Sequence, residues 1–349
     1  MRIAQIAPLY ESVPPKLYGG TERVVYNLTE ELVRAGHEVV LFASGDSETS
    51  AELVPCCERG LRLHGGVRDF HAYLTIQLAM AYARADEFDI IHNHVDYFAF
   101  PFARLARTPT VTTMHGRLDL PEVRRVNGFF REQPLISISN AQRVHLPDAN
   151  WIATVYNGIH VESFTFRPQP GRYLAFLGRV SVEKRLDRAI EVARAVGMPL
   201  LAAAKIDPAD VDYYEHAIRP LLDHNLVEFV GEIDEQAKDA FLGQAYAYLF
   251  PIDWPEPFGI TMIEAMATGT PVIAMDCGSV REVVVDGVTG FICRDVGEMI
   301  RAVHRIPEIS RQACRAHVER RFSRAVMAAG YLEAYRQVLA PREPEAVSA

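Results

Sequence analysis

The sequence predicts an α/β protein built from two doubly wound parallel sheets that face each other across a deep cleft. Its 349 residues, 49% of them hydrophobic, are enough for two domains of ordinary size. In each half, short apolar segments alternate with amphipathic ones, which is typical of parallel strands covered by helices on both faces. The alternation breaks near residues 157–172, where an Asn157-Gly158 turn signal precedes a stretch with two prolines and a glycine. We therefore expect one domain over 1–166 and a second over 167–322.

The first half begins with an apolar strand over residues 3–7, followed by a loop that contains proline and glycine. Thr21 then stands where a helix cap is expected, ahead of one apolar stripe. That stripe consists of Val24, Val25, Leu28, Leu32 and Val33. The other elements predicted here are strands over 37–42, 89–92, 109–114 and near 135–138, and a helix over 70–85.

The second half restarts the same alternation. Its strands are predicted over 173–177, 199–204, 227–230, 248–251 and 271–274. Its helices are predicted over 186–196, 211–222, 236–245, 260–268, 296–305 and 324–339, and residues 341–349 form a frayed tail. In doubly wound sheets, ligands bind beyond the carboxyl ends of the strands, so two facing sheets predict a ligand site in the cleft.

Charge balance and cysteine content narrow the class of protein. With 36 basic and 45 acidic residues the net charge is −9, and neither half is a basic arm, which disfavours a nucleic-acid partner. No uncharged apolar run reaches the length of a membrane span, and the start of the chain lacks the pattern of a signal peptide. Five cysteines without a CxxC pair are typical of reduced thiols, so we expect a cytoplasmic protein.

Two segments carry residues suited to a diphosphate. Gly19 and Gly20 let the backbone approach a ligand, and the following helix offers free N–H groups to an anion, although the dinucleotide pattern GxGxxG is absent. Arg179 and Lys184 lie between a buried strand and a helix, where a guanidinium can fork onto two oxygens and an ammonium adds a point charge. Only four of the 36 basic residues are lysines, which favours a function for Lys184 over an incidental charge in a solvated turn.

The segment from Asp253 to Glu264 is the most specific one. Pro257 keeps Glu256 out of helical geometry, so Glu256 is expected in a loop and the helix is expected to begin at about 258–259. Several backbone N–H groups would then point into the cleft. Glu264 lies about two turns down this helix among apolar neighbours, which predicts a partly buried carboxylate that needs a partner.

Histidines at strand ends leave more than one interpretation open. His115 follows a predicted strand and precedes a glycine, a position that suits either a structural or a functional ring. His92, His94 and Asp96 form half of the HxHxDH metal motif of metallo-β-lactamase-like hydrolases, but Tyr97 replaces its last histidine and no second ligand set is evident. Asp210 and Asp212 form a DxD pattern at a predicted helix start, where capping is the preferred interpretation.

Taken together, these segments resemble the family 4 (group 1) retaining glycosyltransferases, which have the GT-B fold of two Rossmann-like domains. The resemblance covers nearly the whole chain. The GG loop, the HxH-to-HG region, the NG turn, the Gly178-Arg179…Glu183-Lys184 motif and the E-x7-E pair Glu256 and Glu264 occur in the family's order. The resemblance implies that the last helix, about 323–340, packs back on the N-terminal domain.

The resemblance also implies a role for each motif residue. Arg179 and Lys184 would hold the donor's diphosphate, Glu264 the ribose hydroxyls and Glu256 the sugar hydroxyls, with His115 beside the reacting sugar. The amides of Phe258, Gly259, Ile260 and Thr261 would meet sugar or phosphate, and Gly19 and Gly20 would close over the diphosphate. Lys205, Asp207 and the 230–232 stretch, which ends at Glu232, would form the base and phosphate pocket. Arg185, where the family often has glycine, and His160, where it usually has an acid, are departures.

The expected activity is therefore metal-independent, retaining transfer of a hexosyl unit from a UDP-hexose or GDP-mannose donor, without a cofactor. The acceptor, a small molecule, saccharide or lipid-linked sugar, would be chosen by loops over 8–18, 60–72 and 116–133, which carry no readable signature. Alternatives are another GT-B enzyme, such as an epimerase or phosphorylase, a zinc hydrolase on His92, His94 and Asp96, and a degenerate binding module. The base, sugar, acceptor and oligomeric state are not readable from the sequence.

Overall fold

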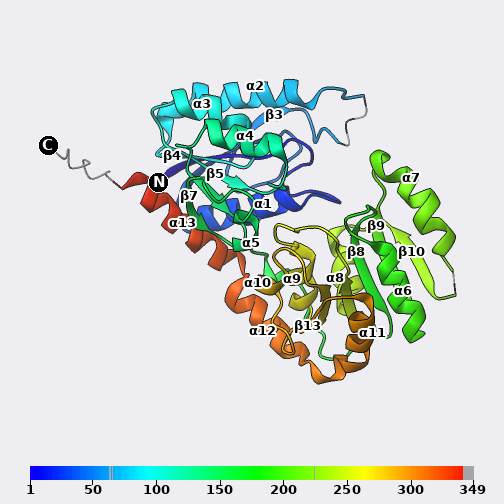
Figure 1. Ribbon diagram of the computed structural model, residues 1–349. Helices are drawn as coiled ribbons and strands as arrows, with labels where there is room; N and C mark the ends of the chain where they lie inside the picture. The colour runs from blue at the N-terminus through cyan, green and yellow to red at the C-terminus, as the bar shows by residue number, and fades with distance from the viewer. Residues whose placement is uncertain (63, 65, 224, 341–349) are drawn as a thin grey trace.

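The computed structural model describes residues 1–62, 64, 66–223 and 225–340, and the predicted C-terminal tail lies outside them. It has two parallel sheets, each with helices on both faces (Figure 1). This confirms the predicted fold class.

The first sheet has seven strands in the order β3-β2-β1-β4-β5-β6-β7. The side chains of its inner strand β1 alternate between two cores, because Ile3 packs with α1 and α13 whereas Ala4 and Ile6 pack with α2. Its strands are β1 (Arg2–Ile6), β2 (Glu38–Ser44), β3 (Glu52–Cys57), β4 (Ile90–Asn93), β5 (Thr110–Met114), β6 (Leu135–Ser137) and β7 (Trp151–Thr154). Its helices are α1 (Gly20–Arg34), α2 (Phe70–Ala83), α3 (Phe100–Leu105), α4 (Pro121–Phe129) and α5 (Asn140–Arg143).

The second sheet has six strands in the order β10-β9-β8-β11-β12-β13, and its two faces share one continuous apolar core. Its strands are β8 (Leu174–Arg179), β9 (Leu200–Lys205), β10 (Val227–Gly231), β11 (Ala247–Phe250), β12 (Val272–Met275) and β13 (Gly290–Cys293). The helices that follow β8 are α6 (Leu186–Val196), α7 (Val211–Tyr213), α8 (Glu235–Gly243), α9 (Ile260–Ala267), α10 (Val280–Val283), α11 (Val296–Arg305), α12 (Arg311–Arg321) and α13 (Arg324–Leu339).

Several local predictions were incomplete or wrong. The strands that the pattern missed, β3, β7 and β13, all lie at sheet edges, where strands are short or interrupted by proline or glycine. Helices α3, α4, α5, α10 and α12 were also missed. The predicted helix over 211–222 is present over 211–221, but it changes from α-helix in α7 to π-helix in Tyr214–Ile218 and to 3-10 helix in Arg219–Leu221. Pro220 lacks the N–H that a continuous helix would need there.

At three predicted helix starts the structure corrects the predicted cap or first residue. Helix α1 begins at Gly20 with Gly19 as its N-cap residue, so Thr21 is not the cap. Helix α9 begins at Ile260, because Gly259 has a left-handed φ of 74° that ends the preceding loop. Asp210 makes no capping hydrogen bond and instead forms an ion pair with Arg179.

The chain passes between the two sheets twice, and the two crossings lie side by side. The Ile159 N–H donates to the Phe322 carbonyl at 2.9 Å, and the Arg324 N–H donates to the Ile159 carbonyl at 2.8 Å. A Cβ on Gly158 would lie 2.6 Å from the Ser323 carbonyl oxygen. The glycine of the NG turn is therefore required by the close approach of the second crossing.

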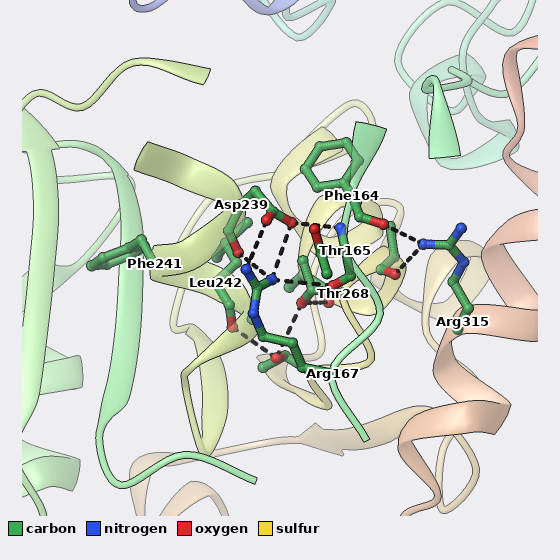
Figure 2. A network of polar contacts seen from close by, with 12 residues as sticks. Phe164, Thr165, Arg167, Asp239, Phe241, Leu242, Thr268 and Arg315 are labelled. Atoms are coloured by element: carbon green, nitrogen blue, oxygen red, sulfur yellow. Dashed lines mark hydrogen bonds and ion pairs between the residues drawn. The ribbon is translucent and has the colours of Figure 1, made fainter. Parts of the chain in front are cut away.

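Beyond the first crossing, the chain is tied to the second sheet's helices (Figure 2). Arg167 donates two side-chain hydrogen bonds to the carboxylate of Asp239 in α8, at 2.8 and 3.2 Å. Asp239 also accepts from the Thr165 N–H at 2.7 Å, and Arg315 of α12 donates to the Phe164 carbonyl at 2.7 Å. These contacts fix residues 164–167 to the C-terminal half.

The last helix, α13, packs on the N-terminal half beside α1 (Figure 1). Its buried residues Met327, Tyr331 and Tyr335 join Ile3 and Leu28 in one apolar cluster. In the described part of the chain, no helix combines the length and apolar character that crossing a bilayer requires.

Candidate functional site

A cavity of about 720 Å³ lies between the carboxyl ends of the two sheets. Of the residues that the sequence placed in the site, all except Val230 and Gly231 line it, although these residues are spread from position 19 to position 264. They are Gly19, Gly20, His115, Arg179, Lys184, Lys205, Asp207, Glu232, Glu256, Phe258, Gly259, Ile260, Thr261 and Glu264. The two halves thus contribute facing walls, as expected where strand ends of two doubly wound sheets meet.

Two cations of the C-terminal wall lie at the end of strand β8 and in the turn after it: Arg179 is the last residue of β8, and Lys184 follows five residues later. The Lys184 ammonium contacts the Glu256 carboxylate, which also accepts a 2.9 Å hydrogen bond from the indole N–H of Trp254. Arg179 lies 3.2 Å from Asp210. Carboxylates therefore hold both cations in the cavity, and an anion with more charge, such as a diphosphate, can compete for them.

Arg185, the residue in the family's glycine position, does not line the cavity. Its guanidinium is held by Asp187 at 2.7 Å and Asp253 at 2.8 Å. The backbone φ of Arg185 is 54°, in the left-handed region that favours glycine, so this chain keeps the conformation without the glycine.

The first turn of α9 forms the floor between these cations. Ile260 and Thr261 line the cavity, and the first N–H groups of a helix have no partners within it. The Thr261 hydroxyl accepts a 2.8 Å hydrogen bond from the Tyr248 hydroxyl, which fixes its position. A Cβ on Gly259 would lie 2.9 Å from the Phe250 ring, so the helix start can pack this closely only with glycine.

Glu264 has the partner that its apolar surroundings required. Its side chain is 0% exposed, and Oε1 lies 2.8 Å from the Lys238 ammonium and 3.7 Å from the Arg23 guanidinium. Its Oε2 has no hydrogen-bond partner among the described residues. A buried carboxylate with one free oxygen at a cavity wall can accept a hydrogen bond from a ligand hydroxyl.

Sequence reasoning missed Lys238 and Arg23 as site residues. Lys238 lies in α8, which carries no motif, and Arg23 lies in α1, three residues after Gly20 of the GG loop. The scarcity of lysine was a usable signal for Lys238, because Lys184, Lys205 and Lys238 all line the cavity and only Lys16 does not. The usable signal for Arg23 was its place in the first turn after the GG loop.

His115 lies at one end of a chain of buried hydrogen bonds. Its Nε2 is 2.9 Å from His94 Nδ1, and His94 Nε2 is 2.7 Å from the Gln5 side-chain oxygen. Because that oxygen accepts, His94 carries its proton on Nε2, and its Nδ1 accepts from His115. Burial lowers the pKa of His115 to about 3, so the ring is neutral and its Nδ1 is an acceptor.

The same chain of hydrogen bonds continues to helix α13. Gln5 donates to the Tyr335 hydroxyl at 3.3 Å, which lies 2.6 Å from His92 Nδ1, and His92 Nε2 lies 2.7 Å from the Thr113 hydroxyl. Both ring nitrogens of His92 and His94 thus have protein partners, which opposes the zinc-hydrolase interpretation. Among the described residues, no group of three or more His, Cys, Asp or Glu side chains is arranged to hold a metal ion.

Polar contacts also bridge the two walls. Glu232 of the C-terminal half accepts a 3.0 Å hydrogen bond from the Tyr18 N–H and lies 3.4 Å from Arg62. Arg23 pairs with Glu235 of α8. The Lys205 ammonium lies 2.5 Å from Asp207 and 5.1 Å from the centre of the Tyr18 ring. The carboxylate of Glu232 thus binds a backbone N–H next to the GG loop, which shows that this loop can bind an anion.

The chain matches two glycosyltransferase family models that together span most of its length. Residues 18–163 match the family described as Glycosyltransferase Family 4, and residues 163–321 match Glycosyl transferases group 1. The chain is 27% identical to glycogen synthase of Mycobacterium tuberculosis, over 92% of this chain and 90% of that protein. It is 28% identical to phosphatidyl-myo-inositol mannosyltransferase of Mycolicibacterium smegmatis, over 83% of this chain and 80% of that protein.

Solved structures share the fold over nearly the whole chain. Sucrose-phosphate synthase from Thermosynechococcus elongatus superposes with a TM-score of 0.80 at 20% identity, covering 97% of this chain and 99% of that one. Anabaena HepE in complex with UDP-glucose superposes with a TM-score of 0.75 at 20% identity, covering 97% and 100%. At these identities the structures establish the fold, which is GT-B.

Proposed function

The chain belongs to the family 4, group 1 glycosyltransferases, enzymes that use nucleotide sugars, and from this premise we propose that it transfers a hexosyl unit from a UDP-hexose to an acceptor hydroxyl. One observation carries the proposal. Arg179, Lys184 and the start of α9 converge on a single cavity, next to a buried carboxylate with a free oxygen. Two cations beside a helix N-terminus suit a diphosphate.

In this proposal each wall residue has one task. Arg179 and Lys184 bind the two phosphates, and the N–H groups at the start of α9 add positive potential. Glu264 accepts hydrogen bonds from the ribose through its free Oε2, and Glu256 accepts from the sugar hydroxyls. The GG loop approaches the diphosphate from the other half, where it would replace its contact with Glu232.

The reaction exchanges one bond to the anomeric carbon for another. The bond to the departing phosphate oxygen breaks, the bond to the acceptor oxygen forms on the same face, and the hydroxyl proton passes to a phosphate oxygen. Negative charge grows on the diphosphate as the sugar gains oxocarbenium character, so Arg179, Lys184 and the helix start stabilise the transition state. Such preorganised groups contribute about 3 kcal/mol each in a cavity that excludes water.

The similar proteins reduce the candidate donors to two. HepE was solved with UDP-glucose, which supports a UDP-hexose donor for a chain of the same fold. The mannosyltransferase relatives make a mannosyl donor, GDP-mannose, the second candidate. Both share the diphosphate and hexose that the cavity is expected to bind, and they differ in the base.

A thermal-shift panel of UDP-glucose, UDP-galactose, GDP-mannose and ADP-glucose tests the donor. A ligand at 100 times its Kd stabilises the folded chain by about 2.7 kcal/mol. We expect a UDP-sugar to give the largest shift, and the shift to disappear in Lys184→Ala. A larger shift with GDP-mannose would replace the proposed base, and no shift with any nucleotide sugar would overturn the site.

A further inference from the structure

The N-terminal wall of the cavity differs in chemistry from the cation-bearing wall opposite. It presents aromatic rings and carboxylates, which include Tyr10, Phe70, Glu22 and Asp96. The proposed function places the acceptor at this wall; resting on it, we propose that the wall takes a sugar without phosphate or carboxylate groups and that Asp96 binds the attacking hydroxyl. The Asp96 carboxylate belongs to the histidine-rich segment that metal binding failed to explain.

Aromatic side chains form a platform on this wall. The Tyr10 and Phe70 rings stack with their centres 4.9 Å apart and 29° between their planes. Tyr10 is 53% exposed, which is unusual for a ring that lines a cavity and leaves one of its faces free for a ligand. The C–H face of a hexose is apolar while its edge carries hydroxyls, so a flat ring beside hydrogen-bond acceptors suits a sugar.

The Asp96 side chain has a hydrogen-bond acceptor that no protein group among the described residues satisfies. Its Oδ1 is buried and has no hydrogen-bond partner within the described part of the chain. Its φ is 50°, a left-handed conformation that costs free energy in a residue other than glycine. Burial raises the pKa of its carboxyl to about 6, against an opposing effect of the His115 N–H. A hydroxyl donor would supply the missing hydrogen bond beside the proposed sugar-binding residue His115.

The charges of this wall select against anionic acceptors. Its two arginines are already neutralised, Arg62 by Glu11 and Glu232, and Arg23 by Glu235 and Glu264. Glu22 is buried in the same wall, and desolvation raises its pKa to about 7. A buried carboxyl group without a strong cationic partner offers no positive charge to a phosphate. Burial raises the pKa of the Tyr10 hydroxyl, and the nearby carboxyl groups of Glu22 and Asp96 raise it further. A phosphate on the aromatic platform would meet carboxylates rather than free cations.

Matched sugar pairs test this acceptor class. UDP release from UDP-glucose is measured with glucose or glucose 6-phosphate, with myo-inositol or myo-inositol 1-phosphate, and with maltose. We expect at least one unphosphorylated sugar to stimulate release and its phosphorylated counterpart to stimulate it less. Preference for a phosphorylated member, or no stimulation by any unphosphorylated sugar, would overturn the acceptor class.

Two substitutions test the assigned residues. Asp96→Asn keeps the shape of the side chain but weakens a charged hydrogen bond, so we expect sugar-stimulated release to fall about tenfold or more. Tyr10→Leu should raise the KM for the sugar about threefold to tenfold and change kcat less. Asp86→Asn, a change on the exposed surface, is the control and should match the wild type.

Donor binding separates this proposal from the function on which it rests. If Asp96→Asn loses stimulation but retains the UDP-glucose thermal shift, the acceptor role is supported. If wild type and Asp96→Asn are stimulated equally, the acceptor role is wrong while the donor assignment stands. If the wild type shows no UDP-glucose shift, it is the donor assignment that fails.

Discussion

The C-terminal wall of the cavity takes four of its charged groups from two compact motifs, whereas the N-terminal wall takes its aromatic and acidic groups from separate segments of the chain. On the first wall, Arg179 and Lys184 lie five residues apart, and Glu256 and Glu264 lie eight apart. The second wall combines three separate places in the fold: Tyr10 lies in the loop after β1, Phe70 at the start of α2, and Asp96 in the turn after β4. A diphosphate requires a fixed geometry of charges, which a short motif supplies. An acceptor is recognised by surface shape, which loops can change without altering the donor site.

The largest expected effect tests the cation-bearing wall. Lys184→Ala removes a charge next to the proposed diphosphate and should lower kcat/KM about 100-fold or more. Glu256→Ala should lower turnover at least about tenfold, because it also loses a contact to the donor sugar. Lys16→Ala, whose side chain is 62% exposed, is the matched control and should have little effect. Wild-type turnover in both site variants would contradict the different roles given to the two walls.

The next effect concerns stability and compares two lysines of the same wall. Lys238→Ala leaves the fully buried Glu264 without its 2.8 Å partner and should lower the free energy of unfolding by about 3 kcal/mol. Lys205→Ala should cost about 1 kcal/mol or less, because its partner Asp207 remains partly exposed. Urea denaturation followed by circular dichroism measures both. Equal losses would mean that Glu264 does not depend on Lys238.

A smaller effect is expected from the buried histidines behind the N-terminal wall. His94→Phe removes the acceptor of the His115 Nε2 proton, so the ring loses its fixed tautomer and orientation. We expect kcat to fall about tenfold with the UDP-glucose thermal shift unchanged. Ring ¹⁵N chemical shifts report the tautomer directly. Protonation of His115 at Nδ1 in the wild type would contradict the hydrogen-bond assignment through Gln5.

The smallest effect is a pH dependence that the N-terminal wall should impose. Burial lowers the pKa values of His92, His94 and His115, so below about pH 6.5 these rings bind protons in the unfolded chain but not in the folded one. Their contribution therefore lowers the free energy of unfolding as the pH decreases. The raised pKa values of Glu22 and Asp96 act in the opposite direction. Three groups outweigh two, and the lowered pKa values of His37, His160 and His317 act in the same direction as the three, so the free energy of unfolding should fall by about 1 kcal/mol or more per pH unit between about pH 6 and 4.5.

Urea denaturation at pH 6.0, 5.25 and 4.5 measures this slope. Constant or rising stability towards acid would mean that the histidines become protonated in the folded chain. His94→Phe should reduce the slope, because it removes one of the three groups.

The C-terminal wall was largely predictable because its motif residues are specified by their neighbours in the chain. Strand β8, the following turn and helix α9 are each specified by their neighbours in the chain, and the motif residues then reach one cavity. The N-terminal wall was not predictable in this way. Tyr10 and Phe70 form a stacked pair only because the loop after β1 meets the start of α2, and no sequence period links positions 10 and 70.

The sequence alone determined the two parallel sheets and the residues of the donor motifs, since apolar alternation and the effects of glycine and proline act over a few neighbouring residues. Only the tertiary structure decided the partners of those residues. Lys238 meets Glu264 across 26 positions, and Gln5 meets Tyr335 across 330. Such pairs depend on how whole elements pack, and burial then makes each unsatisfied polar group costly enough that the packing selects its partner.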